Sequence, residues 1–401
     1  MVNIKSITER IICFIIMINP ILSLFFDNTG VRYHYISLPL LFICCLIVSL
    51  KNKKSFYKIF FISIITVTAI FIAIVNGGKI GKINNHLFNF LAFISLCILF
   101  SNDESISNLI KYLKCRKKMM FIILLIINIV EIYMFVTKKG FYYRFSWGGN
   151  FFKGTSSMPH TLSYLMLTTI IYSIVMFFIC SEKKFLLFSM LPYFFIFESG
   201  ARISLILAGI LGLFEVDIVF SYKEKSKIVK FIKAMIICGM VFLIFKDKIL
   251  ESDLMIKILK RSDSSDASAG RTVLWGDLIG RYIHNPSKWL FGFGDDMVYY
   301  YSGINKTIGE SIWAHNDFIQ TLFGKGIVGI ISYLIGLASY IKTIIKRNGN
   351  HYSLLIIAFF FLAACLNGFY SYRDIMISVP MIYIMNDYLY NKRRIGEQNV
   401  E

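Results

Sequence analysis

Three side chains in the polar stretches of this otherwise apolar chain have the chemistry of a catalytic site. Arg202 stands in the segment ESGAR, Arg271 in AGRTVLW and His315 in AHND. A guanidinium group binds phosphate oxygens in pairs and stays charged at physiological pH. A neutral imidazole can take a proton from a hydroxyl group. We therefore predict that His315, Arg271 and Arg202 are catalytic residues, and that the arginines bind an anionic group such as a lipid diphosphate.

Each of these residues also has a purely structural interpretation. Either arginine could extend its charge to the membrane surface or form an ion pair with Glu198 or Asp277. A histidine at the start of a helix is often a capping or surface residue. Asn316 and Asp317, which follow His315, can orient an imidazole or cap a helix.

The composition indicates that these residues are positioned by elements embedded in a bilayer. Of the 401 residues, 56% are hydrophobic and 17% are charged, and the mean hydropathy is +0.64. Charged residues make up about 25% of ordinary soluble domains. The net charge of +19 does not indicate nucleic-acid binding, because the basic residues fall in short clusters between apolar runs. The tendency of basic residues to face the cytoplasm explains these clusters.

The apolar runs predict an all-α polytopic membrane protein with about 12 transmembrane helices and one large periplasmic loop, since ~20 residues cross the hydrocarbon. The runs are 11–26, 36–50, 59–75, 86–100, 119–136, 161–180, 185–197, 202–220, 228–245, 317–341, 353–369 and 375–390. The predicted divisions are nine N-terminal membrane helices in 1–245, a periplasmic loop in 246–316, and three membrane helices with a cytoplasmic tail in 317–401.

One orientation places every basic cluster on the cytoplasmic side, with both termini in the cytoplasm. The clusters are KNKK, KYLKCRKK, EKK, KEKSK, KTIIKR and KRR. The long loop and the ESGAR segment then face outward, and ESGAR is either a simple turn or a re-entrant corner. Within the long loop, apolar spacing in 249–261 and 272–283 predicts two amphipathic helices on the membrane surface, joined by the serine-rich hinge 262–270.

The remaining reactive residue types give weaker signals. Five of the six histidines map to the outward side, but none has the spacing of a metal-binding pair, so we expect no metal site and no cofactor. The eight cysteines avoid the long loop and are expected to be free thiols. The aromatic clusters 141–147 and 297–301 could stack on sugar rings or form an interfacial aromatic belt.

Four segments together resemble the signature segments of the O-antigen polymerase and O-antigen ligase superfamily. They are ESGARISLI, AGRTVLWGDLI, NPSKWLFGFG and AHNDFIQTLFGKGIVGIISYL, in that family's order, and they span about residues 190–340. The first motif departs from the family pattern. The family often has Ser or Thr with Arg after the glycine, whereas here Ala201 separates Gly200 from Arg202.

The resemblance implies a GT-C-like membrane glycosyltransferase of the bacterial inner membrane that needs neither a nucleotide donor nor a metal. In that scheme Arg202 and Arg271 hold the diphosphate, and His315 acts as or positions the base. Asn316 and Trp275, in the same motifs, are expected to bind substrate with the arginines. The implied partners are an undecaprenyl-diphosphate-linked oligosaccharide, membrane lipid and a chain-length-regulating membrane protein.

Several functions remain open at this point. The first is an O-antigen polymerase of lipopolysaccharide biosynthesis. We favour it because the chain is rich in isoleucine, lysine and phenylalanine, a composition common in horizontally variable glycan clusters. The second is a ligase that transfers finished polymer to lipid A core. A lipid-linked sugar transporter or flippase would need paired broken helices at the midplane, which the sequence does not indicate. A membrane sensor or scaffold would tolerate substitution of the arginines and the histidine.

Overall fold

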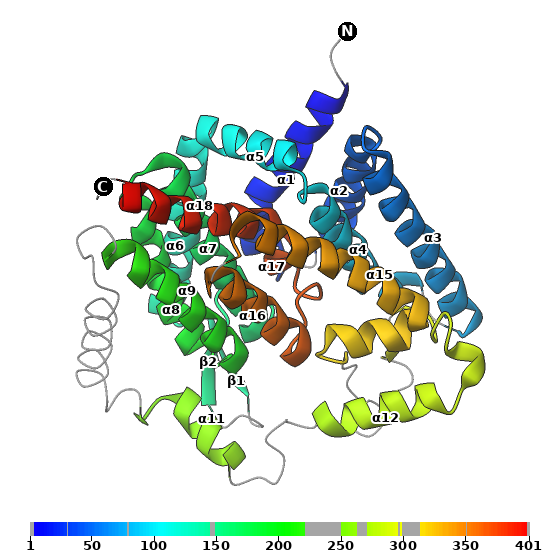
Figure 1. Cartoon of the computed structure of the whole chain (residues 1–401). Helices are drawn as coiled ribbons and strands as arrows, with labels where there is room; N and C mark the ends of the chain where they lie inside the picture. The colour runs from blue at the N-terminus through cyan, green and yellow to red at the C-terminus, as the bar shows by residue number, and fades with distance from the viewer. Residues whose placement is uncertain are drawn as a thin grey trace.

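The computed structural model describes residues 4–29, 31–77, 80–144, 149–220, 250–262, 271–295, 297–298, 313–349 and 351–398. These residues are mostly helical (Figure 1). The helices before the long loop are α1 (Ile4–Phe26), α2 (His34–Ser49), α3 (Lys53–Val75), α4 (Ile80–Leu99), α5 (Asp103–Cys115), α6 (Lys117–Val136), α7 (Pro159–Cys180), α8 (Lys184–Glu198) and α9 (Arg202–Phe220). They are followed by α11 (Asp253–Ser262), α12 (Arg271–Ile283), the 3₁₀ turn Pro286–Lys288, α15 (Asp317–Asn348), α16 (His351–Leu366), α17 (Arg373–Ile377) and α18 (Val379–Gln398).

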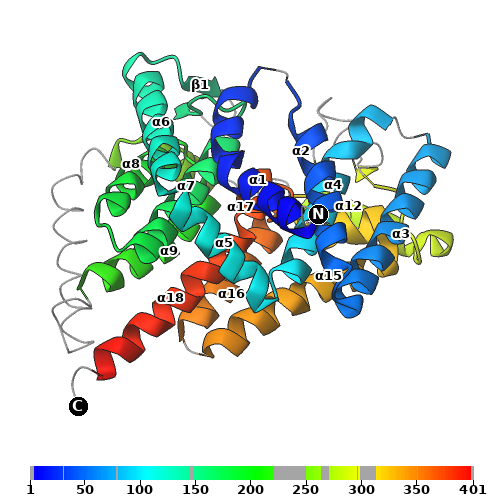
Figure 2. The same cartoon turned by 90° about the horizontal axis from the view of Figure 1, so that it is seen from above.

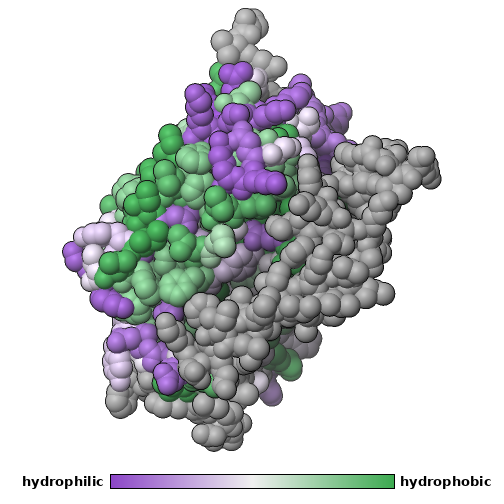
Figure 3. Space-filling view, turned by 90° about the vertical axis from the view of Figure 1, so that its left-hand side faces the viewer, coloured by the Kyte–Doolittle hydropathy of each residue, from purple (hydrophilic) through white to green (hydrophobic). Residues whose placement is uncertain are grey.

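Several of these helices are long and apolar enough to cross a membrane. Within the described ranges five qualify, namely α1, α3, α6, α7 and α15, and the bent pair α4 and α5 would make a sixth span. Figure 3 shows one face of the molecule, where apolar side chains form a broad band with hydrophilic side chains above and below it. The protein is therefore a multi-pass membrane protein, while the predicted number of about 12 helices stays a prediction. The predicted span 228–245 lies outside the described residues.

Helix α7 forms the centre of the bundle. It packs against α8, α9 and α18, and 94% of its apolar window is buried inside the protein. Some of its serine and threonine side chains donate to carbonyl groups of the same helix, as Thr169 does to Leu165 O and Ser173 to Thr169 O. Internal pairing of this kind satisfies hydroxyl groups away from water, so polar residues can lie on the most buried helix.

Helix α5 was not predicted from the sequence. Asn102 caps its N-terminus by accepting a hydrogen bond from the Glu104 backbone N–H, and its axis is bent by 102° from α4. Its buried residues Ile106, Leu109 and Leu113 recur at helical spacing, and its exposed residues include Asp103, Glu104, Lys111 and Lys114. Figure 1 shows α5 at the end of the molecule opposite α11 and α12, and Figure 2 shows it from above.

The mostly helical fold also contains a short β-hairpin, which the sequence did not predict. Strands β1 (Phe141–Arg144) and β2 (Gly149–Phe152) are antiparallel, and Phe141 lies opposite Phe152. Phe151 and Phe152 are fully buried, and Phe152 packs against Phe195 of α8 at 5.1 Å between ring centroids. Aromatic residues favour strands when one face can be buried, so this aromatic cluster is a folded element of the protein core. In the predicted aromatic cluster 141–147, Tyr143 is exposed, and an interfacial or sugar-stacking role of that cluster stays a prediction.

The two loop helices predicted by amphipathic spacing are present as α11 and α12. Leu274, Leu278 and Tyr282 of α12 are buried one turn apart. They join a separate apolar cluster that also contains Ala73 of α3 and Phe323 of α15. The long loop is therefore packed onto membrane helices at this point. Most of the serine-rich hinge lies outside the described residues.

Helix α15 is broken at Gly326, whose φ of 65° and ψ of −161° are not helical. The freed backbone groups pair with the end of the long loop. Phe293 and Gly294 donate to the carbonyl groups of Phe323 and Gly324, and Ile327 and Val328 donate to those of Trp289 and Leu290. A broken helix is tolerated in a membrane protein when other parts of the protein satisfy its backbone, and here the loop segment 289–294 does so.

The ESGAR segment is a tight turn between α8 and α9. Gly200 has a φ of +63°, and a Cβ there would lie 2.4 Å from the Phe151 ring. Lys257 of α11 donates from Nζ to the Gly200 carbonyl at 2.8 Å, and its side chain is buried. The hairpin and α11 thus fix the turn from which Arg202 begins α9.

Candidate functional site

His315 occupies the turn that leads into α15. Its φ of 51° places it in the left-handed region, which a non-glycine residue adopts only when its surroundings hold it there. Asn316 Oδ1 accepts from the backbone N–H groups of Phe318 and Ile319 at 2.9 and 3.1 Å. The helix start predicted from the sequence is therefore present, but Asn316 supplies the cap and His315 does not.

Arg271 and His315 meet at the side chain of Asn367. Arg271 is the first residue of α12 and donates from Nη1 to the Leu366 carbonyl and from Nη2 to Asn367 Oδ1 at 3.4 Å. His315 Nδ1 lies 3.2 Å from the same Oδ1 atom. Residues from the long loop, from the start of α15 and from the end of α16 thus form one cluster.

Arg202 lies close enough to Arg271 for the two charges to interact. Burial lowers the pKa of Arg271, and repulsion by Arg202 lowers it further. Asp277, which the sequence offered as a partner, pairs instead with Arg281 at 2.9 Å. Among the residues that the structure describes, neither Arg202 nor Arg271 forms an ion pair with a carboxylate. Two guanidinium groups whose charges interact, and which have no acidic partner among the described residues, are suited to an anion with more than one charge.

The imidazole of His315 is neutral at physiological pH. Burial lowers its pKa to about 3, and the positive charge of Arg271 contributes in the same direction. Trp313 covers the ring, with its centroid 4.3 Å from that of His315. A neutral imidazole retains one basic nitrogen and can accept a proton.

The loop 367–372 between α16 and α17 holds the cluster in place. Asp317, the first residue of α15, accepts from the backbone N–H groups of Phe369 and Tyr370 at 2.6 and 3.0 Å and from Ser371 Oγ at 3.2 Å. Gly368 has a φ of +91°, and a Cβ there would lie 2.7 Å from the Trp313 ring. The start of α15 and the loop that carries Asn367 are therefore one rigid unit.

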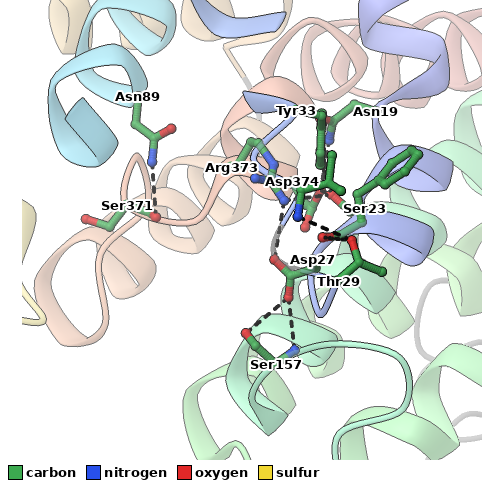
Figure 4. A network of polar contacts seen from close by, with 12 residues as sticks. Asn19, Ser23, Asp27, Thr29, Tyr33, Asn89, Ser157, Ser371, Arg373 and Asp374 are labelled. Carbon is green, nitrogen blue, oxygen red and sulfur yellow. Dashed lines mark hydrogen bonds and ion pairs between the residues drawn. The ribbon is translucent and has the colours of Figure 1, made fainter. Parts of the chain in front are cut away.

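A buried polar network anchors the far end of this loop (Figure 4). Asp374 Oδ1 accepts from Asn19 Nδ2 at 2.8 Å and from Ser23 Oγ, both on α1. Arg373 lies 3.6 Å from Asp27, and Asp27 accepts from the Ser157 backbone N–H at 3.0 Å. Helix α1, the segment before α7 and helix α17 are thereby joined next to the cluster.

Asn316 and Trp275 support the His315 turn. Asn316 Nδ2 donates to the Cys365 carbonyl at 2.9 Å, and Trp275 Nε1 donates to the Ala314 carbonyl at 2.6 Å. The polar groups of both side chains are therefore bound to the protein itself. Their predicted contact with substrate stays a prediction.

Asn367 was missed because the sequence analysis counted it inside the apolar run 353–369. Helix α16 ends at Leu366, and Asn367 and Gly368 begin the loop. Asparagine followed by glycine commonly ends a helix, so the signal for this boundary was present. Its neighbour Tyr164 gave no signal, since a tyrosine in the apolar run 161–180 is most simply interpreted as core. Tyr372 gave none because it lies in the short segment between the runs 353–369 and 375–390.

The remaining reactive residue types form no second site in the part of the chain that the structure describes. Seven cysteines in those ranges are free, and Cys238 lies outside them. In the same ranges no group of three His, Cys, Asp or Glu residues is placed to hold a metal ion.

A comparison with known protein families points to the same part of the chain. Residues 185–334 match the family described as O-antigen ligase. The matched region contains Arg202, Arg271 and His315 and ends before Asn367, and it confirms the resemblance to the O-antigen polymerase and ligase superfamily. The curated proteins include no match to this chain.

Proposed function

We propose that the protein is an O-antigen polymerase, a membrane glycosyltransferase that joins undecaprenyl-diphosphate-linked repeat units on the periplasmic face of the bacterial inner membrane. The observation that carries this proposal is the convergence of Arg271 and a neutral His315 on Asn367, with Arg202 close to Arg271. The match to the O-antigen ligase family over the same residues supports it.

In the proposed reaction Arg202 and Arg271 bind the diphosphate of the donor, and His315 takes the proton of the acceptor sugar hydroxyl. The hydroxyl oxygen forms a bond to the anomeric carbon as the bond from that carbon to the diphosphate oxygen breaks. Undecaprenyl diphosphate leaves with the electron pair, and the arginines stabilise the negative charge that develops on it. No ATP is required, because the diphosphate is already a good leaving group.

The orientation that follows has both termini in the cytoplasm and the site at the outer end of the bundle. Helices α11 and α12 lie at one end of the molecule and α5 at the other (Figure 1), and the basic clusters assign the α5 end to the cytoplasm. A chain-length-regulating membrane protein would act beside the growing polymer. The family description also supports the ligase, which would use the same donor chemistry with lipid A core as the acceptor.

The test is complementation of a strain that lacks the gene, with the surface glycan displayed on a gel. His315→Ala and Arg271→Ala should each abolish chain growth. His315→Ala removes the general base, a loss that lowers rates by about 10² to 10⁴-fold, and Arg271→Ala removes a charge that binds the diphosphate. His284→Ala and Arg281→Ala are matched controls, since His284 is exposed, the Arg281 side chain is 40% exposed, and both residues belong to the same loop. They should restore the full ladder.

The deletion strain distinguishes the two reactions. A core that carries one repeat unit identifies a polymerase. Bare core, with long polymer retained on undecaprenyl diphosphate, identifies a ligase and contradicts the proposal. A normal ladder from His315→Ala would exclude this site from either reaction.

A further inference from the structure

Asn367 is placed to decide which nitrogen of His315 carries a proton. Its side chain contacts four others, and each contact restricts the orientation of its amide group. Arg271 can only donate, so the amide atom that faces Nη2 at 3.4 Å must be the oxygen. The amide nitrogen then faces the hydroxyl oxygens of Tyr164 and Tyr372 at 3.3 and 3.2 Å and donates to both.

The orientation of the amide fixes the tautomer of His315. The atom that faces His315 Nδ1 at 3.2 Å is the same amide oxygen, which can only accept. His315 Nδ1 must therefore carry the hydrogen. A neutral imidazole has one N–H group, so Nε2 keeps its lone pair.

We propose that Asn367 is a positioning residue that holds His315 in the Nδ1–H tautomer and leaves Nε2 as the basic atom of the site. The assignment of the tautomer rests on contacts within the protein alone. Its consequence for the reaction rests on the proposed function, in which Nε2 accepts the proton of the acceptor hydroxyl.

The choice of asparagine at this position has a physical reason. An aspartate would orient the imidazole equally well, but it would add a negative charge beside Arg271. That carboxylate would pair with the guanidinium group, whose charge would then be less available to the diphosphate. The same carboxylate would favour the imidazolium form of His315 and raise its pKa. A neutral amide orients the base and leaves the guanidinium charge available.

The surroundings of Asn367 restrict its movement. The rings of Tyr164 and Tyr372 are stacked with centroids 4.0 Å apart, and the Asn367 side chain donates to both hydroxyl groups. Tyr164 is fully buried on α7, and the Asn367 side chain is 1% exposed. A side chain held from two sides in this way can select one tautomer of its neighbour.

The first test measures the tautomer without substrate. The full-length protein is labelled with ¹⁵N-histidine in lipid nanodiscs, and the His315 signals are assigned by comparison with His315→Gln. We expect a protonated Nδ1 and a pyridine-type Nε2 at neutral pH. In Asn367→Leu the Nε2–H form should appear. A protonated Nε2 in the wild type would overturn the proposal, and so would an unchanged tautomer in Asn367→Leu.

The second test measures polymer formation in membranes as a function of pH. Asn367→Leu should lower the rate by about 10² or more, at the low end of general-base contributions. Asn367→Asp should retain the tautomer, but its activity should fall with decreasing pH in the neutral range where the wild type is constant. Asn386→Leu is the matched control, because Asn386 is also fully buried but donates to Ile344 O near the other end of α15.

The two tests separate this inference from the proposed function. If the tautomer is as expected and His315→Ala is active, the reaction is wrong and the tautomer assignment stands. If His315→Ala is inactive while Asn367→Leu keeps the wild-type rate and pH profile, the proposed function stands and the role of Asn367 is excluded.

Discussion

Lys325 and Asp295 form an ion pair in which both side chains are fully buried. Lys325 adjoins the break in α15, and Asp295 directly follows the loop segment 289–294 that fills the break. The ammonium group also lies over the Phe90 ring of α4, 4.4 Å from its centroid. The pair thus fastens the long loop, which carries Arg271, to the helix that begins beside His315.

Breaking this pair on one side should destabilise the protein strongly. Lys325→Met leaves Asp295 as a buried, uncompensated charge, a change that costs about 3–5 kcal/mol. We expect a lower midpoint of thermal unfolding in detergent, measured by tryptophan fluorescence. Lys342→Met is the control, because Lys342 is exposed on the same helix.

The double substitution Lys325→Met with Asp295→Leu tests whether the cost arises from the unpaired charge. It should recover a large part of the loss, since two apolar side chains can replace a buried ion pair at little cost. An unfolding midpoint as low as that of Lys325→Met would show that the geometry of the pair, and not its charge balance, holds the loop.

The pH dependence of the wild-type rate follows from the environment of His315. The pKa of an ordinary histidine is 6.5, whereas burial and the charge of Arg271 lower that of His315 to about 3. Because the neutral imidazole is the active form, activity is retained as pH falls through 6.5 and is lost only near the lower value. Polymer formation by the protein in lipid nanodiscs, in which both faces meet the buffer, would reveal this profile. An acid limb centred near 6.5 would mean that His315 is freely hydrated or is not the base.

Lys257 should affect the binding of the donor through the turn that begins α9. Its Nζ holds the Gly200 carbonyl at 2.8 Å, two residues before Arg202. A hydrogen bond from a charged group contributes about 1.5–3 kcal/mol. Lys257→Met should therefore raise KM for the lipid-linked donor about tenfold or more, with a smaller change in kcat.

Lys139→Met is the matched control for this prediction, because Lys139 is exposed in the segment before the hairpin. It should leave KM unchanged. Equal losses of kcat in Lys257→Met and in Arg202→Ala, with KM constant in both, would contradict a role for this turn in donor binding.

Sequence patterns predicted the helices of this protein correctly where the signal lay within a short segment. Hydropathy indicated helices that cross a membrane, and apolar spacing indicated α11 and α12. The chemistry of Arg271 and His315 also singled them out, and the structure places them in one cluster. Local signals suffice for these features because periodicity and side-chain type are properties of short segments.

Only the tertiary structure decided which residues of the site contact one another. Asn367 lies 96, 52 and 203 positions from Arg271, His315 and Tyr164, and no local pattern connects residues so far apart. The same reason applies to the break in α15, which is stable only because a loop segment supplies its missing backbone partners. The side-chain types predicted which residues could react, but only the packing of distant segments fixes the proton on His315 and brings the two arginines close enough for their charges to interact.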